Sequence, residues 1–320
     1  MVSSTLSSIF LGGVSILHLK RIFDILLLIL IPYRLMSQLG RGGRRTAQSL
    51  LDGPSNRMLG CYATIGTNQM QAYNQAFARV YNTRWSSFAK QVAPFIHDFY
   101  AASPIGKENK SILDLCCGTG HLALHFLEKG YRVVGLDLSE YMLYHAKENT
   151  FQYVESGQAK FVQGDASDFK LEERFGLVVS TFDALNHLEN GEALRKCFEC
   201  VYTISDGFFI FDLNTRNGLR RWNSIQVDEN SEDALIITRG IYDGQSDKAW
   251  TRITGFAQVS NGLYERFEET AFNSVFEMEG VKNALFDVGW KNVYFAQIQN
   301  LKTPISEPEK EGRVFIVASK

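Results

Sequence analysis

The feature that most constrains the fold is a short apolar run that ends in a glycine turn and continues as a helical pattern. Residues 112–117 (ILDLCC) are apolar except for Asp114, and Gly118-Thr119-Gly120 follows directly. Glycine permits a left-handed turn there and lets a ligand approach the free backbone amides at a helix N-terminus. The segment therefore predicts a buried strand, a ligand-binding turn and a helix.

The middle of the chain repeats this alternation of strand and helix. Helical patterns are expected at 120–129, 140–149 and 191–204. The expected strands are Ser111–Cys116, Tyr131–Leu136, Phe161–Gln163, Leu177–Thr181 and Phe208–Asp212 in the middle, followed by Asn292–Gln297 and Arg313–Ala318 near the end. Such alternation implies helical crossovers and parallel strands. We therefore expect an α/β fold: a doubly wound, Rossmann-like, mostly parallel sheet of about seven strands with helices on both faces.

The sequence pattern changes near residue 232. Three β-like runs, Ala234–Tyr242, Trp250–Val259 and Leu263–Thr270, are parted by Asp-Gly and Asn-Gly pairs, which are strong hairpin signals. This predicts a small antiparallel insertion, a lid of three strands near 232–272. The expected organisation is an extension at 1–69 and one domain at 70–320, comprising N-terminal helices at 70–103, a cofactor-binding core at 108–215, the insertion at 232–272 and a closing helix and strands at 273–320.

The extension differs from the rest of the chain in charge. Residues 1–69 carry +5 of the formal charge of −2, so residues 70–320 carry −7. The apolar run 22–33 is shorter than the ~20 residues of a spanning helix, and Asp24 interrupts it. The extension is expected to be disordered, a targeting segment, or the product of a start placed too early, and membrane-surface contact through residues 1–50 is not favoured. We expect a cytoplasmic protein, with organelle targeting or membrane association through the extension as the alternative.

Three acidic residues follow three consecutive strands. Asp114 lies four residues before the first glycine, Asp137 ends the second strand, and Asp165 follows the third. Ligands of open α/β sheets bind at the carboxyl ends of the strands. A carboxylate beside the glycine turn would oppose a pyrophosphate but would suit a cationic ligand such as S-adenosylmethionine. Asp137 would then accept from the ribose hydroxyls and Asp165 from the adenine amino group.

These motifs resemble those of the class I S-adenosylmethionine-dependent methyltransferases, and the resemblance extends from Gln71 to Lys320. The chain also resembles the small-molecule subgroup that contains glycine and sugar-amine N-methyltransferases, but the motifs that carry this second resemblance are less specific. The segments that carry the resemblance are 113–120 (first motif), 135–143 (ribose segment), 164–166 (adenine segment), 177–187 (the fourth-strand motif, whose loop faces the reacting methyl group), and 267–270 with 289–290 (the late part of the subgroup).

The resemblance implies a set of cofactor-binding residues. The two glycines would lie against the methionine moiety, and Met142 would pack on the adenine ring, although a methionine in a helix core explains it equally well. The full set is Asp114, Gly118, Thr119, Gly120, Asp137, Leu138, Met142, Asp165, Ala166 and Phe182.

Methyl transfer from a sulfonium is an in-line displacement, so the protein's main contribution is alignment. A general base is needed only if the acceptor arrives protonated, and the sequence assigns no catalytic residue. A histidine in the position of His187 more commonly caps a helix or forms part of a lid than acts in catalysis. Tyr81 is more commonly explained by core packing than by contact with the acceptor. The substrate-side candidates are Tyr81, Phe182, Asn186, His187 and Arg239.

The acceptor class is narrowed by what the sequence lacks. Residues 70–320 carry a charge of −7, which does not favour binding to a phosphate backbone. The fourth strand is not followed by the Asn/Asp-Pro-Pro-aromatic motif of methylases that modify amino groups of nucleic acids. A small-molecule acceptor, amine or hydroxyl, is favoured over nucleic acid. No metal site is expected, because the single C-x-x-C pair, Cys197 and Cys200, lacks a second pair.

Two other classes of function stay open at this point. The chain could be a non-catalytic cofactor-binding or assembly protein that keeps a methyltransferase fold. The third hypothesis is an NAD(P)-dependent Rossmann oxidoreductase, because Gly118, Gly120 and Ala123 also match the spacing of dinucleotide-binding turns. The sequence does not predict the oligomeric state.

Overall fold

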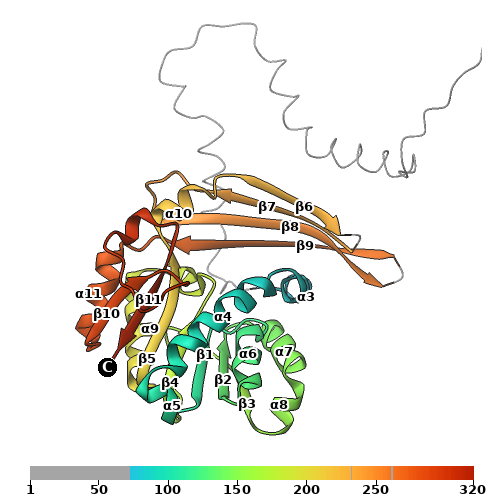
Figure 1. Cartoon of the computed structure of the whole chain (residues 1–320). Helices are drawn as coiled ribbons and strands as arrows, with labels where there is room; N and C mark the ends of the chain where they lie inside the picture. Colours follow the sequence, from blue (N-terminus) through green and yellow to red (C-terminus); the bar gives the residue numbers. More distant parts are fainter. Residues whose placement is uncertain (1–72, 232, 261) are drawn as a thin grey trace, which may run out of the picture. The chain divides into compact units, whose positions relative to one another are not determined.

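The computed structural model describes residues 73–231, 233–260 and 262–320 (Figure 1). The extension at 1–69, and with it the expectation about membrane contact of residues 1–50, lies outside the described residues. In the described part, no helix combines the length and hydrophobicity of a membrane span.

A seven-stranded sheet forms the centre of the fold, in the order β10-β11-β5-β4-β1-β2-β3. Only β11 runs antiparallel to its two neighbours; the other neighbouring strands are parallel. This arrangement confirms the expected doubly wound α/β fold. The strands are β1 (Ser111–Leu115), β2 (Arg132–Asp137), β3 (Ala159–Gln163), β4 (Phe175–Ser180), β5 (Ser205–Asn214), β10 (Asn292–Ala296) and β11 (Arg313–Ser319).

Helices cover both faces of this sheet because its central strands are apolar on both sides. In β1, Ile112 belongs to a core cluster with Phe126 of α6, whereas the next residue, Leu113, belongs to a second cluster with Phe198 of α9. The helices are α3 (Gln75–Arg84), α4 (Ser86–Ala101), α5 (Pro104–Glu108), α6 (His121–Glu128), α7 (Glu140–Asn149), α8 (Phe151–Glu155), α9 (Gly191–Ile204), α10 (Arg216–Arg220) and α11 (Met278–Val288), with short 3-10 turns η2 (Ala184–His187) and η3 (Pro308–Lys310).

The strand order places a crevice at one edge of the sheet. From β1 the chain moves outward through β2 and β3, then returns to the other side of β1 with β4 and β5. The loops that leave β1 and β4 therefore diverge in opposite directions. Open α/β sheets bind their ligands at such a switch point, so the fold by itself directs attention to the carboxyl ends of β1 and β4.

A second, antiparallel sheet has four strands, one more than expected. Its strands are β6 (Ile225–Ser231), β7 (Ala234–Ile241), β8 (Lys248–Ser260) and β9 (Leu263–Ser274), so the sheet begins earlier than residue 232 and ends later than residue 272. The missed strand β6 has a largely polar sequence, in which Ile225 and Val227 are more than half exposed. An exposed edge strand leaves only a weak apolar pattern.

The second sheet packs on α3, as the adjacent ribbons in Figure 1 indicate. Ala234, Ile236 and Phe267 of the sheet share a buried cluster with Phe77 of α3 and Met142 of α7. Asn74 caps α3 through Phe77 N–H, which fixes where the helix begins. Helix α3 therefore lies between the second sheet and the sheet–helix core.

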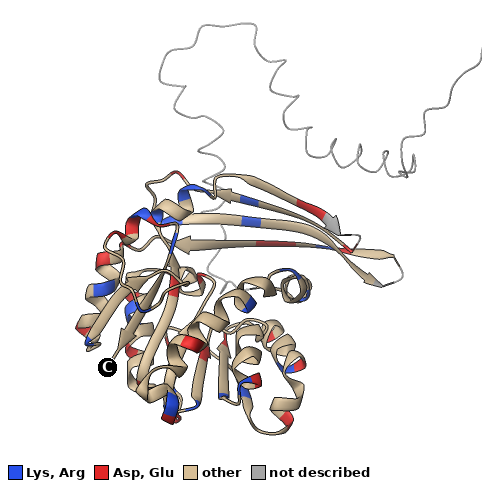
Figure 2. Cartoon of the chain, viewed as in Figure 1, with Lys and Arg blue, Asp and Glu red and all other residues tan. Residues whose placement is uncertain are grey.

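Charged residues of both signs are interspersed along the described part of the ribbon (Figure 2). Several basic side chains pair with acidic ones: on the second sheet, Arg252 and Arg266 both contact Glu268 at 2.5 Å, and Arg79 of α3 contacts Glu265 at 3.2 Å. The positive charges of these arginines are therefore balanced by nearby carboxylates and do not form a continuous basic surface.

A glycine pair tests the packing of the core. We expect Gly135→Ala to lower the free energy of unfolding by about 1–3 kcal/mol, because a Cβ there would lie 2.5 Å from the Phe161 ring and 2.9 Å from Cys117 Sγ. Gly280→Ala, on α11 with open space around it, should raise that energy by about 0.5–1 kcal/mol. Urea titration of both variants measures the difference; equal effects would mean that Gly135 is not tightly packed.

Candidate active site

The glycine turn after β1 has the left-handed backbone that its sequence predicts. Gly118 has φ +52° and Gly120 has φ +77°, and α6 begins immediately afterwards. Gly120 offers no side chain to cap this helix, and Asp114 does so from the strand instead: its Oδ2 accepts from Ala123 N–H at 3.1 Å. The strand carboxylate thus fixes the start of the helix that carries the turn.

Asp114 is buried, with 2% of its surface exposed. Burial raises its pKa to about 8, the Ala123 N–H opposes that shift, and the nearby Asp137 adds to it. Burial therefore favours the protonated form of this carboxyl group. A cation placed beside it would favour the ionised form.

Asp137 at the end of β2 ties the neighbouring loop to the glycine turn. Its Oδ2 accepts from Gly118 N–H at 2.8 Å and its Oδ1 from Ser139 N–H at 2.9 Å. Burial raises its pKa, and these amide donors oppose the rise. Each carboxylate oxygen can accept more than one hydrogen bond, so both can still receive donors from a ligand.

The remaining cofactor candidates lie at unequal depths. Asp165 is exposed after β3, where its Oδ1 accepts from Ser167 N–H and Oγ at 2.8 Å, whereas Ala166 is buried in the core. Leu138 is 46% exposed beside Asp137. Met142 is 1% exposed and packs in the cluster beneath α3, as the helix-core reading of this methionine predicts.

A row of aromatic rings on and beside α3 covers the glycine turn. We call Tyr73, Phe77, Tyr81 and Trp85 the aromatic strip; adjacent members have ring centroids 4.7–6.0 Å apart. A Cβ on Gly118 would lie 3.7 Å from the Tyr81 ring, an ordinary contact distance, so the left-handed backbone and not a lack of space favours glycine there. Burial raises the pKa of Tyr81 well above its ordinary value.

A cavity of about 40 Å³ lies between the strip and the turn. Ligand pockets usually measure about 300–1,000 Å³, so side chains of the strip must move to admit a ligand. The cavity brings together Asp114, Gly118, Thr119, Tyr81 and Phe182, five of the residues expected from the sequence. Its other lining residues are Trp85, Ser86, Ala89, Cys116, Cys117, His121, Leu122 and Thr181.

Tyr81 and Phe182 line this cavity, and the other three substrate-side candidates, His187, Asn186 and Arg239, do not. Asn186 is completely buried, and its amide bonds to the backbone of Asn214 (2.9 and 3.2 Å) and to the Ser274 carbonyl (2.9 Å). Arg239 is exposed, and strand alternation places it on the face of β7 opposite to Ile236, which packs toward α3. The expectation that Asn186 and Arg239 contact the acceptor is therefore wrong: the first cross-links the core, and the second points away.

The other candidates lie near the strip. Phe182 stacks on Phe88 with centroids 4.7 Å apart and lies 6.3 Å from Tyr81. His187, at the end of η2, meets Tyr73 edge-on at 6.5 Å. Glu269 of β9 was not among the residues expected from the sequence; it accepts from Asn74 N–H at 2.8 Å, and burial raises its pKa. Its only signal was its place in segment 267–270.

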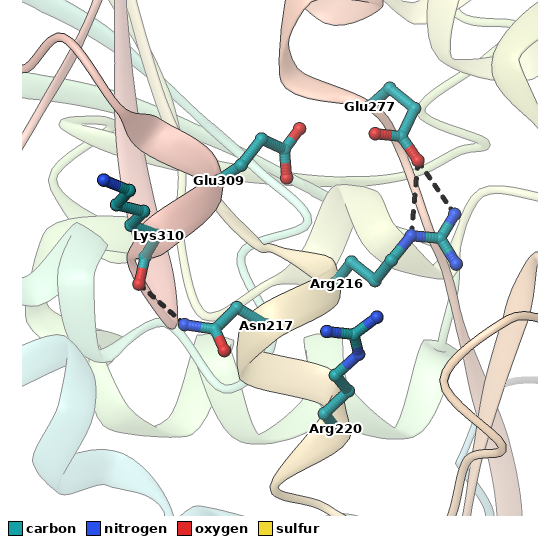
Figure 3. Close-up of a pocket in the computed structure, with 6 residues that line it drawn as sticks. All are labelled: Arg216, Asn217, Arg220, Glu277, Glu309 and Lys310. Carbon is teal, nitrogen blue, oxygen red and sulfur yellow. Dashed lines mark hydrogen bonds and ion pairs between the residues drawn. The ribbon is translucent and has the colours of Figure 1, made fainter.

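A second hollow of about 400 Å³ lies beside α10 (Figure 3). Arg216 there is bonded to Glu277 at 2.8 Å, and Asn217 donates to the Lys310 carbonyl at 2.6 Å. Glu309 accepts from Met278 N–H at 2.7 Å. Most of its polar groups thus hold α10, α11 and η3 together, so the smaller cavity at the glycine turn is the better candidate site.

The residues at the glycine turn fit S-adenosylmethionine. The left-handed turn leaves room above Gly118, a buried carboxyl group faces the cavity, and Asp137 retains acceptor capacity beside it. A ligand with cationic groups and a ribose matches that set of donors and acceptors. A pyrophosphate would meet two carboxyl groups instead.

Comparison with known proteins agrees with this geometry. The family model described as a methyltransferase domain matches residues 112–204. An uncharacterized methyltransferase of Synechocystis is 38% identical over 168 residues, which cover 48% of this chain and 70% of that protein. The chain belongs to the methyltransferase family.

Two further relatives define the range of similarity of this methyltransferase. The dTDP-3-amino-3,4,6-trideoxy-alpha-D-glucopyranose N,N-dimethyltransferase of Streptomyces venezuelae is 39% identical over 87 residues, which cover 27% of this chain and 34% of that enzyme. The crystal structure of an S-adenosylmethionine-dependent methyltransferase from Clostridium acetobutylicum superposes with a TM-score of 0.62 at 20% identity, covering 76% of this chain and 97% of that one. S-adenosylmethionine is the cofactor of this family.

Asp114 makes the methyltransferase's cofactor affinity sensitive to pH. Its carboxyl group must lose a proton to meet a cation, so the affinity for S-adenosylmethionine should rise as the pH approaches about 8. Asp114→Asn keeps an oxygen for Ala123 N–H but mimics the protonated form. We expect it to bind S-adenosylmethionine about tenfold more weakly at pH 8, with a smaller difference at pH 6.

The same substitution should affect stability in the opposite direction. Because the pKa of Asp114 is raised in the folded state, its contribution to stability is complete below the ordinary value near 3.8 and is lost as the pH rises toward 8. Without cofactor, Asp114→Asn should be more stable than the wild type at pH 8 and by a smaller margin at pH 5, because the difference disappears only below the ordinary value near 3.8. Calorimetry and urea titration at both pH values measure the two effects; pH-independent differences would contradict the role of Asp114.

Proposed function

We propose that this methyltransferase transfers the methyl group of S-adenosylmethionine to a small amine. The observation that carries the proposal is a set of contacts among the start of α3, η2 and β9. Tyr73 meets His187 of η2 edge-on, and Asn74 N–H, at the start of α3, donates to Glu269 of β9, so three separate parts of the chain contribute; we call these four residues the mouth. A mouth closed by a helix and a sheet suits a small acceptor better than a polymer.

The charges around this mouth favour an acceptor that is a cation before reaction. Burial raises the pKa of Tyr73, and Asp183, Asp137 and Glu269 raise it further, which places three carboxyl groups within electrostatic range of one ring. The aromatic strip adds π faces that attract ammonium groups. A basic amine gains from both features, whereas a hydroxyl gains from neither.

Bound S-adenosylmethionine supplies an activated methyl group. The chain's residues then have three tasks, which are to bind the cofactor, to align the acceptor, and to exclude water. Asp137 and Asp114 bind the polar ends of the cofactor, and the aromatic strip covers the reacting region. A protonated amine must lose its proton before attack, and we propose that His187 accepts it.

The name of one relative supports an amine acceptor. The Streptomyces venezuelae relative is an N,N-dimethyltransferase of an amino sugar nucleotide, and the similarity to it falls on about a quarter of this chain. Oxygen acceptors and larger substrates remain as outcomes of the test.

The direct test incubates the full chain with S-adenosylmethionine labelled on its methyl carbon and three acceptor pools. These are a small-metabolite extract, the same extract after acetylation of its primary and secondary amines, and total RNA. We expect label to enter the untreated extract, with at least a tenfold loss after acetylation. Label entering RNA, or entering the acetylated extract equally well, would overturn the proposal, and binding without transfer to any pool would favour a non-catalytic cofactor-binding protein.

A histidine pair tests the acceptor side of the site. His187→Gln should lower turnover on the amine found in that extract by about 100-fold, because glutamine cannot accept the proton, and should leave the dissociation constant of S-adenosylmethionine unchanged. His145→Gln, on α7 beside Tyr144, serves as the matched control and should leave both quantities unchanged. Equal effects of the two substitutions would exclude His187 as the base.

A further inference from the structure

The loop after β4 has an unusual backbone at the wall of the cavity. Phe182 and Asp183 are consecutive and neither is glycine, yet their φ angles are +68° and +49°. Side chains other than glycine disfavour this left-handed region, so such a conformation persists only where its surroundings impose it. Phe182 and Thr181 line the cavity that also holds Asp114 and Gly118.

One buried carboxylate imposes that turn. Asp212, near the end of β5 and 1% exposed, accepts from Phe182 N–H at 2.6 Å through Oδ1 and from Asp183 N–H at 3.0 Å through Oδ2. Two consecutive amides that point toward one carboxylate require the turn that is observed. The acceptor comes from the strand next to β4, so the sheet itself fixes its position.

Arg313 completes the arrangement from β11. Its Nη1 donates to Asp212 Oδ2, and its Nη2 donates to Asp183 Oδ1 at 2.6 Å. The guanidinium also lies over Phe88 at 4.8 Å and Phe182 at 5.6 Å from the ring centroids. Arg313 pairs with Asn214 in the antiparallel register, which places it diagonally opposite Asp212.

We propose that Arg313, Asp212 and Asp183 form a positioning unit that fixes the turn 181–183 and holds the Phe182 ring at the sulfonium of the cofactor. The proposal rests on the proposed function. If Asp137 holds the ribose and Asp114 the amino group, the sulfonium would be held between them, at the cavity that Tyr81 and Phe182 line. An aromatic face held there attracts the positive sulfonium but not the neutral sulfur of S-adenosylhomocysteine.

This difference supplies a readout that general destabilisation does not change. Arg313→Lys and Asp212→Asn keep the size of each side chain but break the two-pronged bonding. We expect each to weaken the binding of S-adenosylmethionine about threefold to tenfold relative to that of S-adenosylhomocysteine, measured by calorimetry on the full chain. The matched control is Arg174→Lys, at the other end of β5, where Arg174 bonds Asp206 at 2.6 Å and the Thr203 carbonyl at 2.7 Å. It should leave the ratio unchanged.

Backbone amide exchange followed by nuclear magnetic resonance gives a second measurement that needs no ligand. The amides of Phe182 and Asp183 should exchange at least tenfold faster in Asp212→Asn than in the wild type or in Arg174→Lys. An unchanged affinity ratio in both Arg313→Lys and Asp212→Asn would overturn the positioning role, as would equal exchange rates. If the wild type binds neither ligand, the proposed function fails, and the exchange rates alone decide whether the unit fixes the turn.

Discussion

The hydrogen bond from Gly118 N–H to the Asp137 carboxylate is the interaction on which the rest of the site depends. It joins the turn after β1 to the end of β2, two points that parallel pairing already brings side by side. The same carboxylate receives Ser139 N–H and so fixes the entry to α7, while Asp114 fixes the entry to α6. Two strand-end carboxyl groups therefore orient both helices that border the crevice.

The part of the fold that repeats could be predicted from the sequence. Buried parallel strands leave continuous apolar runs, and helices of two turns or more leave a clear period, so β1 to β5 and the helices α6, α7 and α9 were expected near their observed positions, whereas the five-residue α8 was not. The glycine turn could be predicted equally well, because a left-handed backbone conformation strongly favours glycine. The expectation that Asp114 and Gly118 share a site follows from topology alone, since one strand carries both.

The rest could not be predicted because it depends on contacts between distant segments. Arg313 and Asp212 are about a hundred residues apart, and only the antiparallel register of β11 against β5 brings them together. Asn186 looked like a mouth residue because it follows β4, but its amide is consumed by Asn214 and Ser274. The orientation of Arg239 depends on which face of the second sheet packs on α3, and a strand with apolar residues on both faces does not reveal that.

The most direct test of the account is the affinity of the purified full chain for S-adenosylmethionine with and without the Asp137 carboxylate. We expect Asp137→Ala to weaken binding by roughly 1.5–3 kcal/mol, the usual contribution of hydrogen bonds to a charged group. Circular dichroism of the same sample shows whether the variant is folded. A folded variant that binds S-adenosylmethionine as tightly as the wild type would contradict the placement of the cofactor at this edge of the sheet.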